Sequence, residues 1–198
     1  MIPDDRFRDS FTPYGIIVNK VGVCASYASS FKLLADAAGL KSIVVTGYLN
    51  GYLPHAWNRV YIEDEWFTLD VTNNDNPELY NSLLNLWDDV SALVLVEDDL
   101  YMLNTEIAKY TAVSDKLEYY RYNNRFFLQD KIAEKLAEGL DENNFVTLRT
   151  DENLTSDELN KILTAVARDP RFRGRMDYLD QVEVYFFLGC ITLKHVEP

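Results

Sequence analysis

The sequence contains few cysteines, few basic residues relative to acidic ones, and no long hydrophobic run. Two cysteines in 198 residues, Cys24 and Cys190, are too few for a disulfide scaffold, although one bridge is compatible with the count. No stretch approaches 18 consecutive apolar residues, and the N-terminus has no basic segment followed by an apolar one. We therefore expect neither a membrane span nor a signal peptide.

The shortage of basic residues also limits the partners. The chain has 19 Lys and Arg against 32 Asp and Glu, a net charge of −13 that repels phosphate backbones, so we expect no nucleic-acid partner. Residues 1–110 hold 16 acidic and 7 basic residues, a net of −9, and residues 111–198 hold 16 and 12, a net of −4. A substrate of the first half is therefore expected to be neutral or basic.

Hydrophobic residues make up 47% of the chain and charged residues 26%, which is typical of a soluble globular protein. The first half predicts one helix followed by short strands. Apolar residues at steps of three and four predict the helix over 23–38, ended by Gly39. Strands are predicted by β-branched and aromatic runs at 42–48, 56–62, 66–71 and 92–96.

The second half predicts a mixture of helices and strands. A spacing of four predicts a helix over 128–140, and 145–149 resembles a strand. Thr155 and Glu158 form a capping box that predicts a further helix start. The run 181–196 is strand-like, with Gly189 marking a bulge or turn. We therefore expect two domains, 1–100 and 101–198, the second being an α+β module.

Three residues of the first half suggest nucleophilic chemistry. Cys24 stands where the predicted helix begins, and the exposed amides of a helix N-terminus stabilise a thiolate. His55 directly precedes the predicted strand 56–62 and can serve as the base. Asp70 closes the partner strand and can hold the imidazole in its productive tautomer.

The predicted hairpin allows a test of this trio. A turn of two or four residues around Asp64 and Glu65 places Asp70 opposite Arg59, on the same face as His55. Four residues then separate His55 from that position, about 13 Å along the strand. We therefore predict a bulge or a shifted register near Asn58 or Leu69, and an unbroken tight hairpin would count against a triad.

The combined motifs resemble the transglutaminase-like superfamily across about residues 14–96. The residues that carry the resemblance are Gly22-Val23-Cys24-x-x-Tyr27-Ala28-x-x-Phe31-x-x-Leu34, Ala38-Gly39-Leu40, His55-Ala56-Trp57-Asn58-x-Val60 and Trp66-Phe67-x-x-Asp70-x-Thr72. The resemblance implies an α+β, papain-like core in which a Cys-bearing helix packs on an antiparallel sheet. It also implies that Cys24 is the nucleophile, His55 the general base and acid, and Asp70 the orienting residue.

Further site residues are expected around this trio. The Cys24 backbone N–H is the natural oxyanion donor at a helix start, and Tyr14 or Asn19 is a candidate for the second. We assign Trp57, Asn58 and Tyr14 to substrate binding. Two alternatives remain open, since Trp57 can be a core residue and Asn58 a polar residue at the strand edge.

The resemblance implies acyl transfer or hydrolysis at peptide or isopeptide carbonyls of a protein or peptide, through a thioester acyl-enzyme. The alternative is an inactive domain of the same fold that binds or scaffolds another protein. Thiol chemistry of this kind needs no cofactor, and the acidic runs 63–65 and 97–99 lack the spacing of a calcium loop, so we expect no metal. Many bacterial relatives of this type are exported; without an export signal we expect a cytoplasmic protein if the chain is complete, and a cell-surface or secreted one if it is an excised domain.

Outside the trio, the remaining residues of interest favour ordinary structural roles. Cys190 lies in an apolar run and is expected to be buried and inert. His195 is expected at the surface. Arg171, Arg173 and Arg175 form the basic cluster of the chain, for which a solvated loop is favoured over an anion site.

Overall fold

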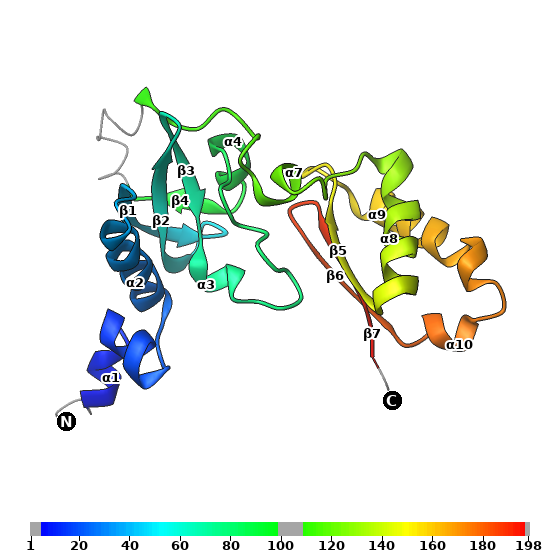
Figure 1. The fold of residues 1–198 in the computed structure, drawn as a ribbon, viewed down its shortest axis with the longest axis horizontal. Helices are drawn as coiled ribbons and strands as arrows, with labels where there is room; N and C mark the ends of the chain where they lie inside the picture. Colours follow the sequence, from blue (N-terminus) through cyan, green and yellow to red (C-terminus); the bar gives the residue numbers. More distant parts are fainter. Residues whose placement is uncertain (1–4, 99–108, 197–198) are drawn as a thin grey trace. The chain divides into compact units, whose positions relative to one another are not determined.

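The computed structural model describes residues 5–98 and 109–196 (Figure 1). Contacts between residues divide the chain into two compact units, the first formed by Met1–Asp75 with Leu83–Glu118 and the second by Asn76–Ser82 with Tyr119–Pro198. The short segment Asn76–Ser82 therefore packs with the second unit although it interrupts the first in sequence. Each unit mixes helices with an antiparallel sheet, so the fold class is α+β.

The first unit is a four-stranded antiparallel sheet with helices around it. Its strand order is β3-β2-β1-β4, and α2 packs along β1 and β2. The elements in chain order are α1 (Asp5–Asp9), the π-helix η1 (Gly15–Asn19), α2 (Cys24–Ala37), β1 (Ser42–Leu49), β2 (Leu53–Ile62), β3 (Glu65–Leu69), α3 (Val71–Asn74), α4 (Asp88–Ser91) and β4 (Leu95–Glu97).

The predicted elements of this unit are largely confirmed. The helix predicted over 23–38 is α2, with Val23 and Ala38 as its caps. The strand predicted over 66–71 ends at Leu69, because Asp70 caps the short helix α3 instead of extending the strand. The strand predicted over 92–96 begins only at Leu95, since the chain turns before it.

Gly47 shows how closely the central strands approach. It lies in β1, where a β-carbon would come within 2.0 Å of the Val96 carbonyl oxygen and 2.9 Å of the Trp57 ring. Only glycine therefore allows β4 to pair with β1 at this point while Trp57 fills the core behind it.

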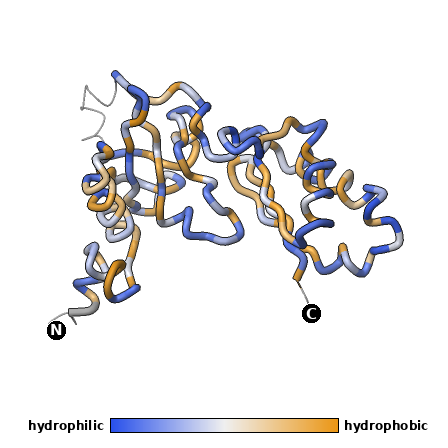
Figure 2. The backbone as a smooth tube through the Cα atoms, in the orientation of Figure 1, coloured by the Kyte–Doolittle hydropathy of each residue, from blue (hydrophilic) through white to orange (hydrophobic). Residues whose placement is uncertain are grey.

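The second unit places two helices on one face of a three-stranded antiparallel sheet of order β5-β7-β6. Its core is formed by apolar residues of α8, α9 and the strands, and Figure 2 shows hydrophobic residues along these strands and alternating hydropathy along α8. The elements are α7 (Tyr119–Tyr122), α8 (Gln129–Asn143), β5 (Phe145–Arg149), α9 (Ser156–Ala167), the 3₁₀ helix η2 (Pro170–Phe172), α10 (Met176–Leu179), β6 (Val182–Phe187) and β7 (Cys190–His195).

Sequence signals for this unit are also confirmed. Thr155 caps α9, and its hydroxyl accepts from the Glu158 N–H while the Glu158 carboxylate accepts from the Thr155 N–H. The strand-like run 181–196 is a hairpin, with Leu188 and Gly189 turning the chain at positive φ. Among the described residues no helix is both long and apolar enough to cross a membrane.

Candidate active site

Cys24 is the first residue of α2 and carries a free, partly buried thiol. The helix start is fixed by Ser26, whose fully buried hydroxyl accepts from the Val23 N–H at 2.8 Å and donates to the Val23 carbonyl oxygen at 2.6 Å. Gly22 leaves room for this arrangement, because a β-carbon there would come within 2.2 Å of Ser26 Oγ. The first N–H groups of a helix lack the usual intrahelical partners. In α2 the N–H groups of Ser26 and Tyr27 donate to the Val23 carbonyl oxygen, so those of Cys24 and Ala25 are the ones left near the thiol.

His55 and Asp70 meet across the β2–β3 hairpin. His55 Nε2 lies 2.7 Å from Asp70 Oδ2, and the two residues are 9% and 0% exposed. A carboxylate only accepts hydrogen bonds, so the Nε2 hydrogen points at Asp70 and Nδ1 is left for another partner. In this buried position the bond holds the imidazole in one orientation and one tautomer.

The register of the hairpin explains this contact and corrects the sequence prediction. The pairing runs without interruption from Ile62–Glu65 to Asn58–Leu69. Of the two predicted alternatives, the bulge is therefore wrong and the shifted register is present. The turn consists of Glu63 and Asp64, both at positive φ, and not of Asp64 and Glu65.

Moving the turn by one residue changes every partner by two. Asp70 follows the last pair and comes opposite Trp57, two residues from His55 on the same face. About 7 Å then separates the two backbones, which the side chains span. An unbroken hairpin therefore brings the two residues together, contrary to the expectation that it would count against the triad.

Asn73 is a residue of this site that the sequence prediction missed. Asp70 is the N-cap of α3, and its Oδ1 accepts from the Asn73 N–H at 3.1 Å. The Asn73 side chain folds back, so that Nδ2 donates to Asp70 Oδ2 at 2.5 Å and lies 3.3 Å from His55 Nε2. An aspartate three residues before an asparagine, at the end of a strand, was the available signal.

The helix that carries Cys24 is tied to the strand that carries His55. Asn58 of β2 donates from Nδ2 to the Ala28 carbonyl oxygen of α2 at 2.9 Å and to the Ile43 carbonyl oxygen of β1 at 3.1 Å. Ala28 lies one helical turn from Cys24. Within residues 5–98 and 109–196, no hydrogen bond joins the Cys24 sulfur to the imidazole, so the described contacts connect only His55, Asp70 and Asn73.

The three residues assigned to substrate binding occupy different environments. Asn58 is fully buried, and its amide nitrogen is used within the fold. Trp57 is 1% exposed and stacks on His55, with ring centroids 6.0 Å apart. Tyr14 is 56% exposed and precedes η1. Asn19, the other candidate oxyanion donor, contacts Asp9 Oδ2 at 3.3 Å.

A buried ion cluster lies on the face of β2 that carries His55, and the sequence prediction did not include it. Arg59 donates to Asp88 Oδ1 at 2.7 Å and to Glu97 Oε1 at 2.5 Å. Burial opposes the charged guanidinium, but the two carboxylates outweigh it and raise the pKa of Arg59. With Trp57 and Thr68 these residues line a cavity of about 440 Å³, which has a net negative lining.

The other residues of interest have structural partners. Cys190 is fully buried, as predicted. His195 is half-buried and stacks on Tyr178 at 4.1 Å between ring centroids. Arg171 and Arg175 pair with Asp169 and Asp141. The described part of the chain has no group of three or more His, Cys, Asp or Glu side chains placed to hold a metal ion.

Part of the chain is similar to known proteins. The model of the transglutaminase-like superfamily matches residues 3–71. The chain carries a transglutaminase-like core. Two curated proteins, the kyphoscoliosis peptidases of Mus musculus and Homo sapiens, are each 30% identical to it over 79 residues. That alignment covers 34% of this chain and 12% of either peptidase, so the chain spans a small part of their length.

A solved structure described as "Crystal structure of a TGase" is also similar to part of this chain. It shares 23% sequence identity with the chain, has a TM-score of 0.34, and covers 37% of this chain and 19% of its own. The α+β fold class with a papain-like core, expected from the motifs, is confirmed.

Proposed function

We propose that the transglutaminase-like core is a cysteine-dependent acyl-transfer enzyme that acts on peptide or isopeptide carbonyls. Cys24 is the nucleophile, His55 the general base and acid, and Asp70 the residue that orients the imidazole. The observation that carries the proposal is the buried 2.7 Å contact between His55 Nε2 and Asp70 Oδ2, which leaves Nδ1 to accept the thiol proton. The name peptidase of the partly matching relatives agrees with this class of reaction.

The proposed reaction has two steps. The Cys24 thiol gives its proton to His55 and its sulfur bonds to the carbonyl carbon, while the Cys24 N–H stabilises the oxyanion. The C–N bond then breaks, and the leaving amine takes the proton from His55, which leaves a thioester. Water or an amine, deprotonated by His55, attacks the thioester; a new C–O or C–N bond forms, the C–S bond breaks and the thiol regains its proton.

The proposed substrate is a neutral or basic peptide, and the exposed Tyr14 is the proposed contact for it. Support comes from the net charge of −9 over residues 1–110, which attracts basic peptides and repels acidic ones. Trp57 and Asn58 are proposed to support the site from inside the fold, Trp57 by stacking on His55 and Asn58 by joining the Cys24-bearing helix to β2.

The test is a thiol-directed activity probe followed by a peptide screen. The full chain and the variants Cys24→Ala and Cys190→Ala are treated with the probe, and we expect Cys190→Ala to react like the parent protein and Cys24→Ala not to react. The same proteins are then given neutral, basic and acidic fluorogenic peptides, with and without methylamine. Free acid as product indicates hydrolysis, and a methylamide indicates transfer to the amine.

The alternative is a binding module without activity. It is favoured by the observation that, among the residues the structure describes, no hydrogen bond joins the Cys24 sulfur to the His55 imidazole. Probe labelling that is equal in Cys24→Ala and the parent protein, with no peptide turned over, would overturn the enzyme proposal and favour this alternative.

A further inference from the structure

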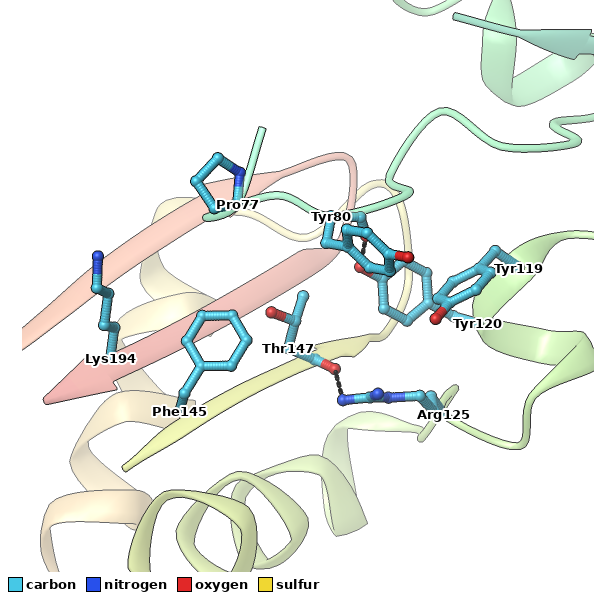
Figure 3. A pocket seen from close by; sticks show the side chains of 8 residues that line it. All are labelled: Pro77, Tyr80, Tyr119, Tyr120, Arg125, Phe145, Thr147 and Lys194. Atoms are coloured by element: carbon cyan, nitrogen blue, oxygen red, sulfur yellow. Dashed lines mark hydrogen bonds between the residues drawn. The ribbon is translucent and has the colours of Figure 1, made fainter. Parts of the chain in front are cut away.

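The second unit contains a cavity of about 330 Å³ on the face of its sheet that points away from the helices (Figure 3). Side chains alternate along β5, so that Val146 and Leu148 enter the core beneath α8 and α9 while Phe145 and Thr147 line the cavity. Lys194 of β7 pairs with Phe145 and lies on the same face. Two neighbouring strands therefore form the floor of the cavity.

The segment Asn76–Ser82 crosses this face and forms a wall. It is held by hydrogen bonds from Thr192 Oγ1 to the Glu78 carbonyl oxygen and from Tyr120 Oη to the Tyr80 carbonyl oxygen. Both hydrogen bonds are accepted by backbone carbonyl oxygens of the segment. The side chains of Pro77 and Tyr80 are thereby placed over the strands and remain available to a ligand (Figure 3).

Aromatic rings give the cavity its apolar character. Tyr80 is 52% exposed and Phe145 is 39% exposed, and Tyr119 meets Tyr80 edge to face with ring centroids 5.9 Å apart. Exposed aromatic rings around a concave site bind a planar apolar group well, because the bound group packs against the faces and edges of the rings. The cavity volume of about 330 Å³ lies near the lower end of the usual range for ligand sites, which suits a single aromatic side chain.

The charge of the lining is opposite to that of the chain. Arg125 and Lys194 line the cavity, and none of its described lining residues is acidic, in a protein of net charge −13. Lys194 Nζ lies 3.4 Å from Glu78 Oε1, so its charge is already partly balanced. Within the described part of the chain, the Arg125 guanidinium makes one hydrogen bond, from Nη2 to the Thr147 carbonyl oxygen at 2.8 Å. That contact holds the guanidinium in place and leaves other N–H groups for an anion.

We propose that this cavity binds the C-terminal residue of a peptide when that residue is aromatic. The carboxylate contacts Arg125, and the ring packs between Phe145, Pro77 and Tyr80. A chain terminus combines the two features that the lining complements, a carboxylate and an adjacent aromatic ring. The site lies entirely within the second unit and does not depend on Cys24 or on the proposed enzyme activity.

The test measures binding of three short peptides to the full chain by isothermal titration calorimetry. The peptides are acetyl-Ala-Ala-Phe with a free carboxylate, the same peptide as its C-terminal amide, and acetyl-Ala-Ala-Ala with a free carboxylate. We expect the first to bind about tenfold or more tightly than either of the others, because the amide loses the charge-assisted bond and the alanine peptide loses the ring contacts. Repeating the titration with Cys24→Ala should leave these affinities unchanged.

Variants assign the binding to the cavity. Arg125→Gln should weaken binding of the free-acid peptide about tenfold and leave the affinity for the amide peptide unchanged. Arg173→Gln, a matched change at an exposed arginine, should alter neither affinity. Tyr80→Leu should weaken binding of both phenylalanine peptides. The variant keeps the hydrogen bond from Tyr120 Oη to the backbone carbonyl oxygen of residue 80. Equal affinity for acid and amide, or no binding at millimolar concentration, would overturn the proposal; these two results come from the parent protein and hold even if Arg125→Gln does not fold.

Discussion

His55 and Asp70 form a buried pair, with His55 Nε2 2.7 Å from Asp70 Oδ2, at the point where the β2–β3 hairpin ends. The two carboxylate oxygens of Asp70 have different partners: Oδ1 caps α3, and Oδ2 accepts from His55 and from the Asn73 side chain. The bond that caps α3 therefore helps to hold the Asp70 carboxylate where it contacts His55.

Cys24 should be alkylated much faster than Cys190. Cys24 is partly exposed at a helix N-terminus, whereas Cys190 is 0% exposed. Iodoacetamide at pH 6, where an ordinary thiol is almost wholly protonated, followed by mass spectrometry of the peptides, measures both rates. His55→Ala should slow the reaction at Cys24 only. Equally slow labelling of both cysteines would contradict an activated thiol.

Asp70→Asn should lower kcat by about 10²–10⁴-fold while leaving the fold intact. Asparagine still caps a helix, but its amide group offers His55 either tautomer. The measurement is steady-state kinetics on the best peptide of the screen, with thermal unfolding as a check. Asp36→Asn removes an exposed carboxylate that pairs with Lys32 and should change neither quantity. An unchanged kcat in Asp70→Asn would remove Asp70 from the mechanism.

Asn73→Ala should lower kcat by about tenfold and leave KM nearly unchanged, since Asn73 positions the Asp70 carboxylate through its Nδ2 and backbone N–H. The alanine keeps the backbone bond and loses the side-chain bond. Asn160→Ala, at an exposed position of α9, serves as the control. A rise in KM with constant kcat would instead indicate that Asn73 contacts the substrate.

Gly22→Ala should reduce the free energy of unfolding by about 1–3 kcal/mol. The added methyl group would overlap Ser26 Oγ and the Ile16 side chain, so the cap of α2 must shift. Urea unfolding measures the loss, and Val21→Ala, at a 62% exposed neighbour, should change the value by less than about 0.5 kcal/mol. A variant as stable as the parent protein would show that the cap can relax without cost.

Protonation of the Glu158 carboxylate should make the second unit less stable in acid. The backbone N–H and then the hydroxyl of Thr155 donate to its carboxylate and lower the pKa of Glu158 below its ordinary value of 4.5. A lowered folded-state pKa gives stability that is complete above the ordinary value and is lost as the pH falls through the lowered one. Unfolding midpoints at pH 7 and pH 3 should therefore differ less in Glu158→Gln than in the parent protein. The same difference in both proteins would contradict this role of the capping box.

Local sequence patterns were sufficient for many elements. Apolar residues at helical spacing located α2 with Cys24 at its start, and Thr155 with Glu158 located the start of α9. These features depend on residues within one or two turns of each other. The papain-like core was implied by the resemblance of the ordered motifs to the transglutaminase-like superfamily.

Contacts between distant residues required the tertiary structure. The acidic run suggested a turn at Asp64 and Glu65, whereas the structure has it at Glu63 and Asp64, and this register brings Asp70 closer to His55. Only the folded chain brings Arg59 to Asp88 and Glu97, 29 and 38 residues away.

The sequence by itself determined the helices α2, α8 and α9, the approximate positions of most strands and the residue types of the candidate site. The tertiary structure decided the register of the hairpin, the place of Asn73 beside Asp70, and the membership of Asn76–Ser82 in the second unit. The physical reason is that hydrophobic periodicity and capping act along a few residues of chain, whereas register and side-chain contacts depend on the packing of the whole core.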